Sequence, residues 1–170
     1  MNVFMVILRL IHIFAGIFWV GTIWYFALFF LPRVKTFGQE QGRIMQTMSG
    51  QPFPTYMTTA AISVALSGIL MYWYTSAGFK AAWIFTPPGV ILTLAALLGI
   101  FAVLEGFFIS RPAAERMAQL GREAAAASGP PAPAVMQEMQ ALSARLERGI
   151  YRTAVVILLT VIGMAVFRYL

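Results

Sequence analysis

Residues 3–31 read VFMVILRLIHIFAGIFWVGTIWYFALFFL, an apolar run that contains one arginine and the only histidine of the chain. A helix needs about 20 apolar residues to cross the ~30 Å hydrocarbon core of a bilayer, and this run is long enough. Residues 56–74, 89–109 and 150–167 form three further runs of this kind. The sequence therefore predicts an all-α fold, a four-transmembrane-helix bundle that makes up a single membrane domain over residues 1–170.

The composition excludes several other classes of protein. Hydrophobic residues make up 60% of the 170 residues and charged residues 11%, which is more apolar surface than a soluble core of this size can bury. Because the chain has no cysteine and one histidine, it cannot form a disulfide, an iron–sulfur cluster or a multi-histidine metal centre within one chain. Basic residues do not alternate with aromatic residues in one solvated patch, so we expect no nucleic-acid partner despite the net charge of +6.

The distribution of basic residues predicts the orientation. Of the 12 lysines and arginines, nine lie on the side of the loops that follow the first and third spans: Arg33, Lys35, Arg43, Arg111, Arg116, Arg122, Arg145, Arg148 and Arg152. The other three are Arg9, Lys80 and Arg168. Since lysine and arginine are retained on the cytoplasmic side, we expect an N-out/C-out protein. The expected localisation is the bacterial cytoplasmic (inner) membrane, where the spans contact the lipid bilayer.

Both long loops are expected to contain helices. Residues 39–48 are predicted to form a short interfacial helix, because Ile44, Met45 and Met48 fall on one face. Residues 112–149 contain two helical stretches that the breaker SGPPAP separates. Apolar residues recur every three or four positions in both stretches: Ala113, Met117, Leu120 and Ala124, then Val135, Met139, Leu142 and Leu146. This pattern predicts an antiparallel helical hairpin on the cytoplasmic side, between the third and fourth spans.

The unusual residues of the first span share one helical face. His12, Gly16 and Trp19 lie within about 60° of arc, and Arg9 lies at the edge of that face. One interpretation is a haem b site, in which His12 is an axial ligand of the iron, Gly16 and Trp19 border the ring, and Arg9 lies near a propionate.

Two other interpretations of His12 remain open. It can hydrogen-bond across the bundle while Arg9 extends to the lipid headgroups, and the candidate partners are then Ser63, Ser67 and Thr160. It can also serve a proton relay or contact a substrate, because ionisable residues within membranes are commonly functional.

The second span carries a stripe of small and weakly polar residues, namely Thr59, Ser63, Ser67, Gly68 and Met71. Most stripes of this kind pack against another helix. Ser67 and Met71 lie at the expected depth of His12, so they are candidate cofactor-binding residues. Met71 and Met164 are the candidate thioethers for a sixth iron ligand.

Glu105 is the second ionisable group expected inside the membrane. A carboxylate there is costly unless it is paired or protonated, and the candidate partners near its depth are Arg33, Arg111 and Arg152. Structural pairing is one interpretation, and a proton or quinone role is the other. The ten methionines form no series along a span that would favour a copper path.

The segments RLIHIFAGIFWVG (residues 9–21) and FFLPRV (residues 29–34) resemble the first helix of the CopD and HemJ-like superfamily of small four-helix membrane proteins. The matching positions are His12, Trp19, Gly21, Pro32 and Arg33. HemJ-type proteins are protoporphyrinogen IX oxidases that bind haem b through the histidine of this helix, so the resemblance implies that His12 is an axial ligand. They also use a lysine in the third helix, whereas residues 90–108 here contain neither lysine nor histidine.

These observations leave functions of two classes. The first is a haem b protein with a redox or electron-transfer role in the membrane, and the second is a cofactor-free structural subunit or permease-like bundle. The resemblance adds protoporphyrinogen IX oxidation and CopD-like copper transport as further alternatives. A homo-oligomer or a larger membrane complex is the candidate protein partner in each case.

Overall fold

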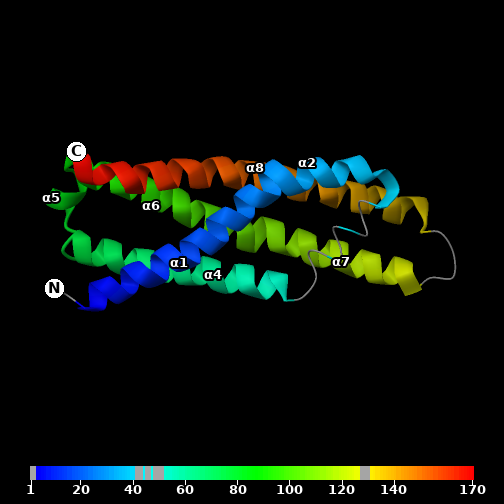
Figure 1. Cartoon of the computed structure of the whole chain (residues 1–170), viewed down its shortest axis with the longest axis horizontal. Coiled ribbons are helices and arrows are strands. Elements are labelled where there is room, and N and C mark those ends of the chain that lie inside the picture. Colours follow the sequence, from blue (N-terminus) through cyan, green and yellow to red (C-terminus); the bar gives the residue numbers. More distant parts are fainter. Residues whose placement is uncertain (1–2, 41–43, 45–46, 48–51, 127–130) are drawn as a thin grey trace.

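The computed structural model describes residues 3–40, 44, 47, 52–126 and 131–170. The all-α class is confirmed, because helices and short connections make up this part of the chain and it contains no strand (Figure 1). In order, the elements are α1 (Val3–Tyr25), η1 (Phe26–Phe30), α2 (Leu31–Val34), η2 (Lys35–Glu40), α4 (Phe53–Thr75), α5 (Ala81–Ile84), α6 (Pro87–Glu105), η3 (Gly106–Ser110), α7 (Arg111–Ala126), α8 (Pro133–Val166) and η4 (Phe167–Tyr169).

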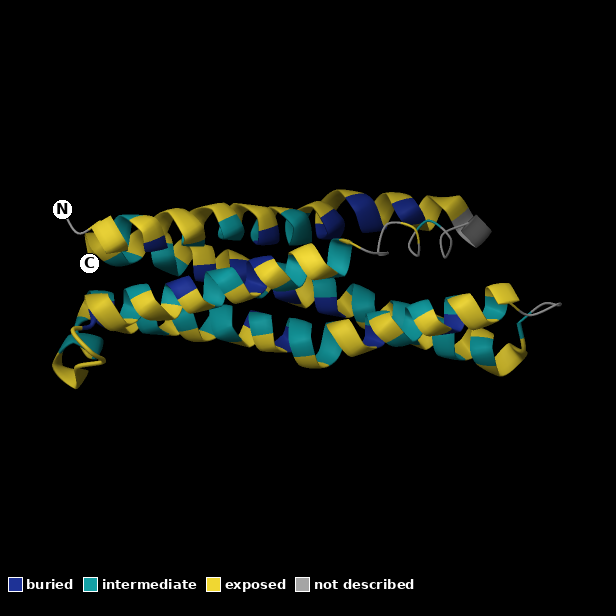
Figure 2. Ribbon diagram, turned by 90° about the horizontal axis from the view of Figure 1, so that it is seen from below, coloured by how far each residue is buried: buried dark blue, intermediate teal, exposed yellow. Residues whose placement is uncertain are grey.

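Four helical stretches are long and apolar enough to cross a membrane: Val3–Phe37, Phe53–Thr75, Pro87–Ala126 and Pro133–Tyr169. The four expected spans lie inside them. In each stretch only 17% of the most apolar window is buried within the molecule, and exposed residues cover the outer faces of the helices (Figure 2). Such outward apolar surface suits a lipid environment and not water, which supports a multi-pass membrane protein.

The long helices associate as two antiparallel pairs, α1 with α4 and α6 with α8. In Figure 1, α1 crosses the bundle obliquely and its end approaches α8, where the indole N–H of Trp24 donates to the carbonyl of Ala154 at 3.2 Å. The two pairs meet at a buried cluster to which all four helices contribute, formed by Trp19, Ala60, Ala61, Ala102 and Ile157.

Small residues bring α6 and α8 close together. A Cβ atom added to Gly163 would lie 2.8 Å from the Cβ of Ala95, and one added to Gly99 would lie 3.3 Å from the Cγ2 of Thr160. Small residues allow helix backbones to approach closely in lipid, where dispersion and not the hydrophobic effect drives association. No pattern in the sequence alone predicts this contact.

Two π-helical turns lie within the first and third of the long helical stretches. The π-helices η1 and η3 are each followed by a proline two residues later, Pro32 and Pro112. A proline inside a helix lacks an N–H and clashes with the carbonyl four residues before it, and a π-turn accommodates both defects without ending the helix. The third span therefore continues into α7.

The expected hairpin is formed by α7 and the first part of α8. Ala113 and Leu120, two residues of the predicted apolar stripe, are buried. Arg116 crosses to Glu138 through two hydrogen bonds, Nε to Oε1 at 2.7 Å and Nη2 to Oε2 at 3.1 Å, and these bonds hold the pKa of the Glu138 carboxyl below its usual range. The hairpin is not a separate unit, because α8 continues from it into the fourth span without interruption.

The interfacial helix predicted over residues 39–48 lies largely outside the described residues. Its first two residues, Gln39 and Glu40, belong instead to the 3₁₀ helix η2, Lys35–Glu40.

Candidate functional site

His12 lies on α1 where this helix packs against α4. Its Nδ1 atom is 3.0 Å from the carbonyl oxygen of Val64 and 3.2 Å from the hydroxyl of Ser67. A Cβ atom added to Gly68 would lie 2.9 Å from the Cε1 atom of the imidazole. The ring therefore rests directly on the backbone of α4, and the absence of a side chain at Gly68 makes this contact possible.

The hydrogen bonds define which nitrogen of His12 carries the proton. A carbonyl can only accept, so the bond to Val64 requires a hydrogen on Nδ1. The Ser67 hydroxyl donates to the carbonyl of Ser63 at 2.5 Å, which leaves its lone pairs available to accept from Nδ1. In the neutral imidazole the lone pair is then on Nε2. Among the described residues, no group hydrogen-bonds this atom.

Of the three partners considered for His12 from the sequence, Ser67 is confirmed. Ser63 takes part indirectly, through the carbonyl that orients Ser67. Thr160 is not a partner: its hydroxyl donates to the carbonyl of Val156 at 3.0 Å within α8. The carbonyl of Val64 could not be predicted from the sequence, because every residue carries a carbonyl and only the register of the two helices selects one.

The other candidate residues occupy different environments. Arg9 is exposed, one turn before His12, and Gly16 is partly buried one turn after it, with Val64 as its nearest neighbour. Trp19 is buried in the central cluster. Met71 is partly buried on α4, four residues beyond Ser67, while Met164 lies on α8. The structure thus brings His12, Gly16 and Ser67 to the same contact between α1 and α4, and encloses Trp19 in the core.

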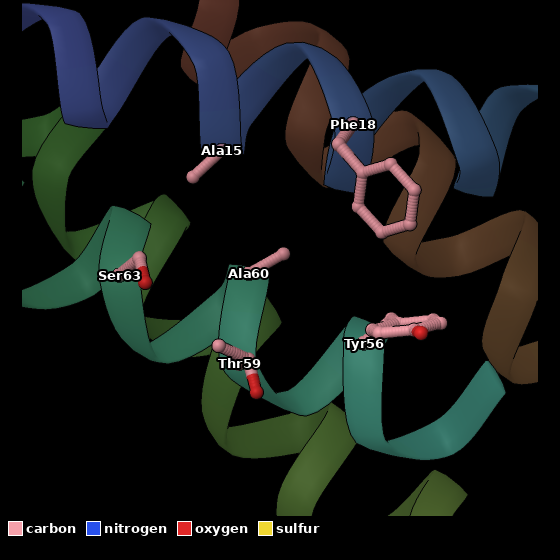
Figure 3. A pocket seen from close by; sticks show the side chains of 6 residues that line it. All are labelled: Ala15, Phe18, Tyr56, Thr59, Ala60 and Ser63. Atoms are coloured by element: carbon pink, nitrogen blue, oxygen red, sulfur yellow. The ribbon is translucent and has the colours of Figure 1, made fainter. Parts of the chain in front are cut away.

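An open groove of about 460 Å³ follows the same contact between α1 and α4. It is lined by Ala15, Phe18, Tyr56, Thr59, Ala60 and Ser63. Figure 3 shows the rings of Phe18 and Tyr56 toward one end, and Ala15 and Ser63 toward the other. His12 is not among the lining residues, and it precedes Ala15, at the second end, by about one helical turn. Of these residues, Thr59 and Ser63 belong to the small and weakly polar stripe predicted from the sequence, and the other four do not.

Glu105 forms a second polar site, between α6 and α8. Its side chain is 1% exposed, and its Oε1 atom accepts from Nη2 of Arg152 at 2.5 Å. The hydroxyl of Thr153 donates to Oε2, and a Cβ atom added to Gly149 would lie 3.3 Å from Oε1. Structural pairing of Glu105 is therefore confirmed, with Arg152 as the partner. Arg111 pairs instead with Glu115 at 2.8 Å.

Within the described part of the chain, no three histidine, aspartate or glutamate side chains gather in a way that could hold a bare metal ion. Comparisons with protein-family models, with characterised proteins and with solved structures found no match. The geometry of the two polar sites is therefore the basis for any functional assignment.

Proposed function

We propose that this protein binds haem b at the contact between α1 and α4, with Nε2 of His12 as an axial ligand of the iron, and that it has a redox or electron-transfer role. The observation that most supports this proposal is the hydrogen bond from Nδ1 of His12 to the carbonyl of Val64. Histidines that bind metals commonly donate their other N–H to a carbonyl, which orients the ring and directs the lone pair of the free nitrogen toward the metal.

The surrounding residues fit a porphyrin better than a bare ion. A porphyrin supplies four nitrogen ligands itself, so one histidine is sufficient, whereas an ion would need several protein ligands. The groove that begins at Ala15, about one helical turn beyond His12, is lined mainly by apolar and small side chains, as a flat apolar ring requires. Arg9, exposed one turn away, supports the proposal because a propionate needs a cation at the membrane surface.

The residues of this chain have separate roles in the proposed site. The carbonyl of Val64 and the hydroxyl of Ser67 orient the imidazole, and Gly68 lets it lie against α4. When bound, the iron would supply one-electron chemistry. Because the chain has one histidine, a monomer would have five-coordinate iron or a methionine such as Met71 as the sixth ligand.

We propose the N-out/C-out orientation together with this function. The described chain begins and ends at one end of the bundle, and the α7–α8 hairpin lies at the other (Figure 1). Nine of the 12 basic residues are on the hairpin side of the spans, which favours a cytoplasmic hairpin in the bacterial inner membrane.

A cofactor-free structural or permease-like bundle is the second candidate. It is favoured by the close contact of the imidazole with Gly68 and by the bonds of Nδ1 to Val64 and Ser67. These contacts would be enough to explain a histidine that only packs two helices together.

Absorption spectroscopy separates the two candidates. Protein expressed with ample haem and purified in detergent should have a Soret band, and a pyridine haemochrome assay should give about one haem per chain. His12→Ala should abolish both signals without changing the elution volume. Phe14→Ala, an outward-facing substitution on the same helix, is the matched control and should keep the full band. A colourless wild type, or a full Soret band in His12→Ala, would support the cofactor-free bundle.

A further inference from the structure

The outward face of α8 changes from apolar to basic along its length. The exposed apolar residues of this face are Val155, Leu159 and Ile162. The exposed basic residues are Arg145, Arg148 and Arg152. The spacing of three or four residues places all six within about 100° of arc. The face that a lipid chain would contact therefore leads directly into a row of guanidinium groups.

The described carboxylates neutralise only part of this row of arginines. Arg152 donates through Nη2 to Glu105, but half of its side chain remains exposed. Among the side chains that the structure describes, none is an acidic partner of Arg145 or Arg148. The neighbouring carboxylate, Glu147, pairs with Lys35 at 2.5 Å. Three arginines thus face outward, and the carboxylate that contacts this row is the buried Glu105 of α6.

The arginines lie at the depth of lipid phosphates. The apolar stretch of α8 begins near Ile150, so Arg148 is about 3 Å and Arg145 about 8 Å beyond it at 1.5 Å per residue. The headgroup layer extends roughly 5–8 Å beyond the hydrocarbon core on each side. Arg152 lies just inside this boundary, where a long side chain can extend outward to the headgroups.

We infer that this face of α8 binds an anionic phospholipid. Its phosphate lies between Arg148 and Arg152, and its acyl chains lie along Val155, Leu159 and Ile162. The N–H groups of Arg152 that Glu105 does not use, together with those of Arg148, match the oxygens of a phosphate in charge and in donor geometry. The adjacent apolar row favours a lipid over free phosphate, which has no chains to contact it. The inference does not depend on haem.

Native mass spectrometry of the full-length protein in a neutral detergent tests this inference. Phosphatidylglycerol is expected to bind about tenfold more tightly than phosphatidylcholine with the same acyl chains. Arg145→Gln and Arg148→Gln should each weaken phosphatidylglycerol binding about fivefold, as expected for the loss of one basic residue near the surface. Arg152 is not replaced in this experiment, because it also holds Glu105.

Arg122→Gln is the matched control. Arg122 is also exposed, and its substitution removes the same charge. It lies on α7, about 20 Å along the helix beyond Ile109, and so outside the headgroup layer. This variant should bind phosphatidylglycerol like the wild type.

Equal binding of the two lipids, equal losses in Arg122→Gln and Arg148→Gln, or full displacement by millimolar inorganic phosphate would overturn the inference. His12→Ala should leave lipid binding unchanged, so failure of the haem proposal is distinguishable from failure of this one.

Discussion

Glu105 and Arg152 differ in exposure, and this difference determines how each residue responds to loss of the other. The Glu105 side chain is 1% exposed, whereas that of Arg152 is 50% exposed. An unpaired Arg152 can extend to the headgroups and water, but an unpaired Glu105 stays inside the bundle. A buried charge without its partner costs far more than the pair itself contributes.

We predict that Arg152→Ala destabilises the protein more than Glu105→Gln does. Arg152→Ala should cost about 3 kcal/mol, because it leaves a carboxylate in the interior with Thr153 as its remaining partner. Glu105→Gln should cost about 1 kcal/mol, since the amide is neutral and still hydrogen-bonds Thr153. Unfolding in detergent, followed by circular dichroism, measures both changes.

Arg148→Ala provides the control for loss of a positive charge, because Arg148 is exposed on the same helix without an acidic partner among the described residues. The double variant Glu105→Gln/Arg152→Ala should be more stable than Arg152→Ala alone. If Arg148→Ala is as destabilising as Arg152→Ala, the buried-charge explanation is wrong.

The helices α6 and α8 are held together by small residues that let their backbones approach closely. The backbones of Gly163 and Gly99 lie against Ala95 and Thr160, and near the other end Gly149 leaves space for the carboxylate of Glu105. A methyl group in a contact that is already tight forces the helices apart and weakens dispersion along the whole pair.

We predict that Gly163→Ala destabilises the α6–α8 pair by about 1–3 kcal/mol, the usual cost of overpacking. Its added Cβ atom would lie 2.8 Å from the Cβ of Ala95, and neither atom can rotate away. Gly21→Ala on α1 is the matched control, because no heavy atom lies within 4 Å of its added Cβ. That substitution should be neutral or stabilise by up to about 1 kcal/mol through helix propensity. Equal unfolding midpoints for the two variants would contradict the prediction.

For the whole molecule, the arrangement of two antiparallel pairs places the α7–α8 hairpin and the termini at opposite ends (Figure 1). The pairs are joined through the central cluster around Trp19. We therefore expect the hairpin on one side of the membrane and both termini on the other.

We predict that the hairpin is cytoplasmic, because most of the basic residues lie on its side of the spans. An alkaline phosphatase fusion at Gly121 should be inactive, and one after Leu170 should be active. Green fluorescent protein fused at the same positions should give the opposite pattern. Phosphatase activity at Gly121 would reverse the assigned orientation.

The sequence alone determined the features that depend on one helix at a time. Four apolar stretches predicted four long helices, because the length and polarity of a span follow from the thickness of the bilayer. The repeats that start at Ala113 and Val135 predicted a hairpin, since the spacing of apolar residues on a helix places them on one face. The position of Glu105 inside an apolar stretch likewise favoured a basic partner at a similar depth, as one of two interpretations.

The tertiary structure decided everything that depends on how the helices pair and in which register. It selected Arg152 from three candidate partners of Glu105, and the carbonyl of Val64 as a partner of His12. It also brought Ala15 and Phe18 together with residues of α4 to form the groove. Helical periodicity specifies which residues share a face but not which face meets which neighbour. A backbone carbonyl or a glycine contact becomes specific only when two helices are fixed side by side.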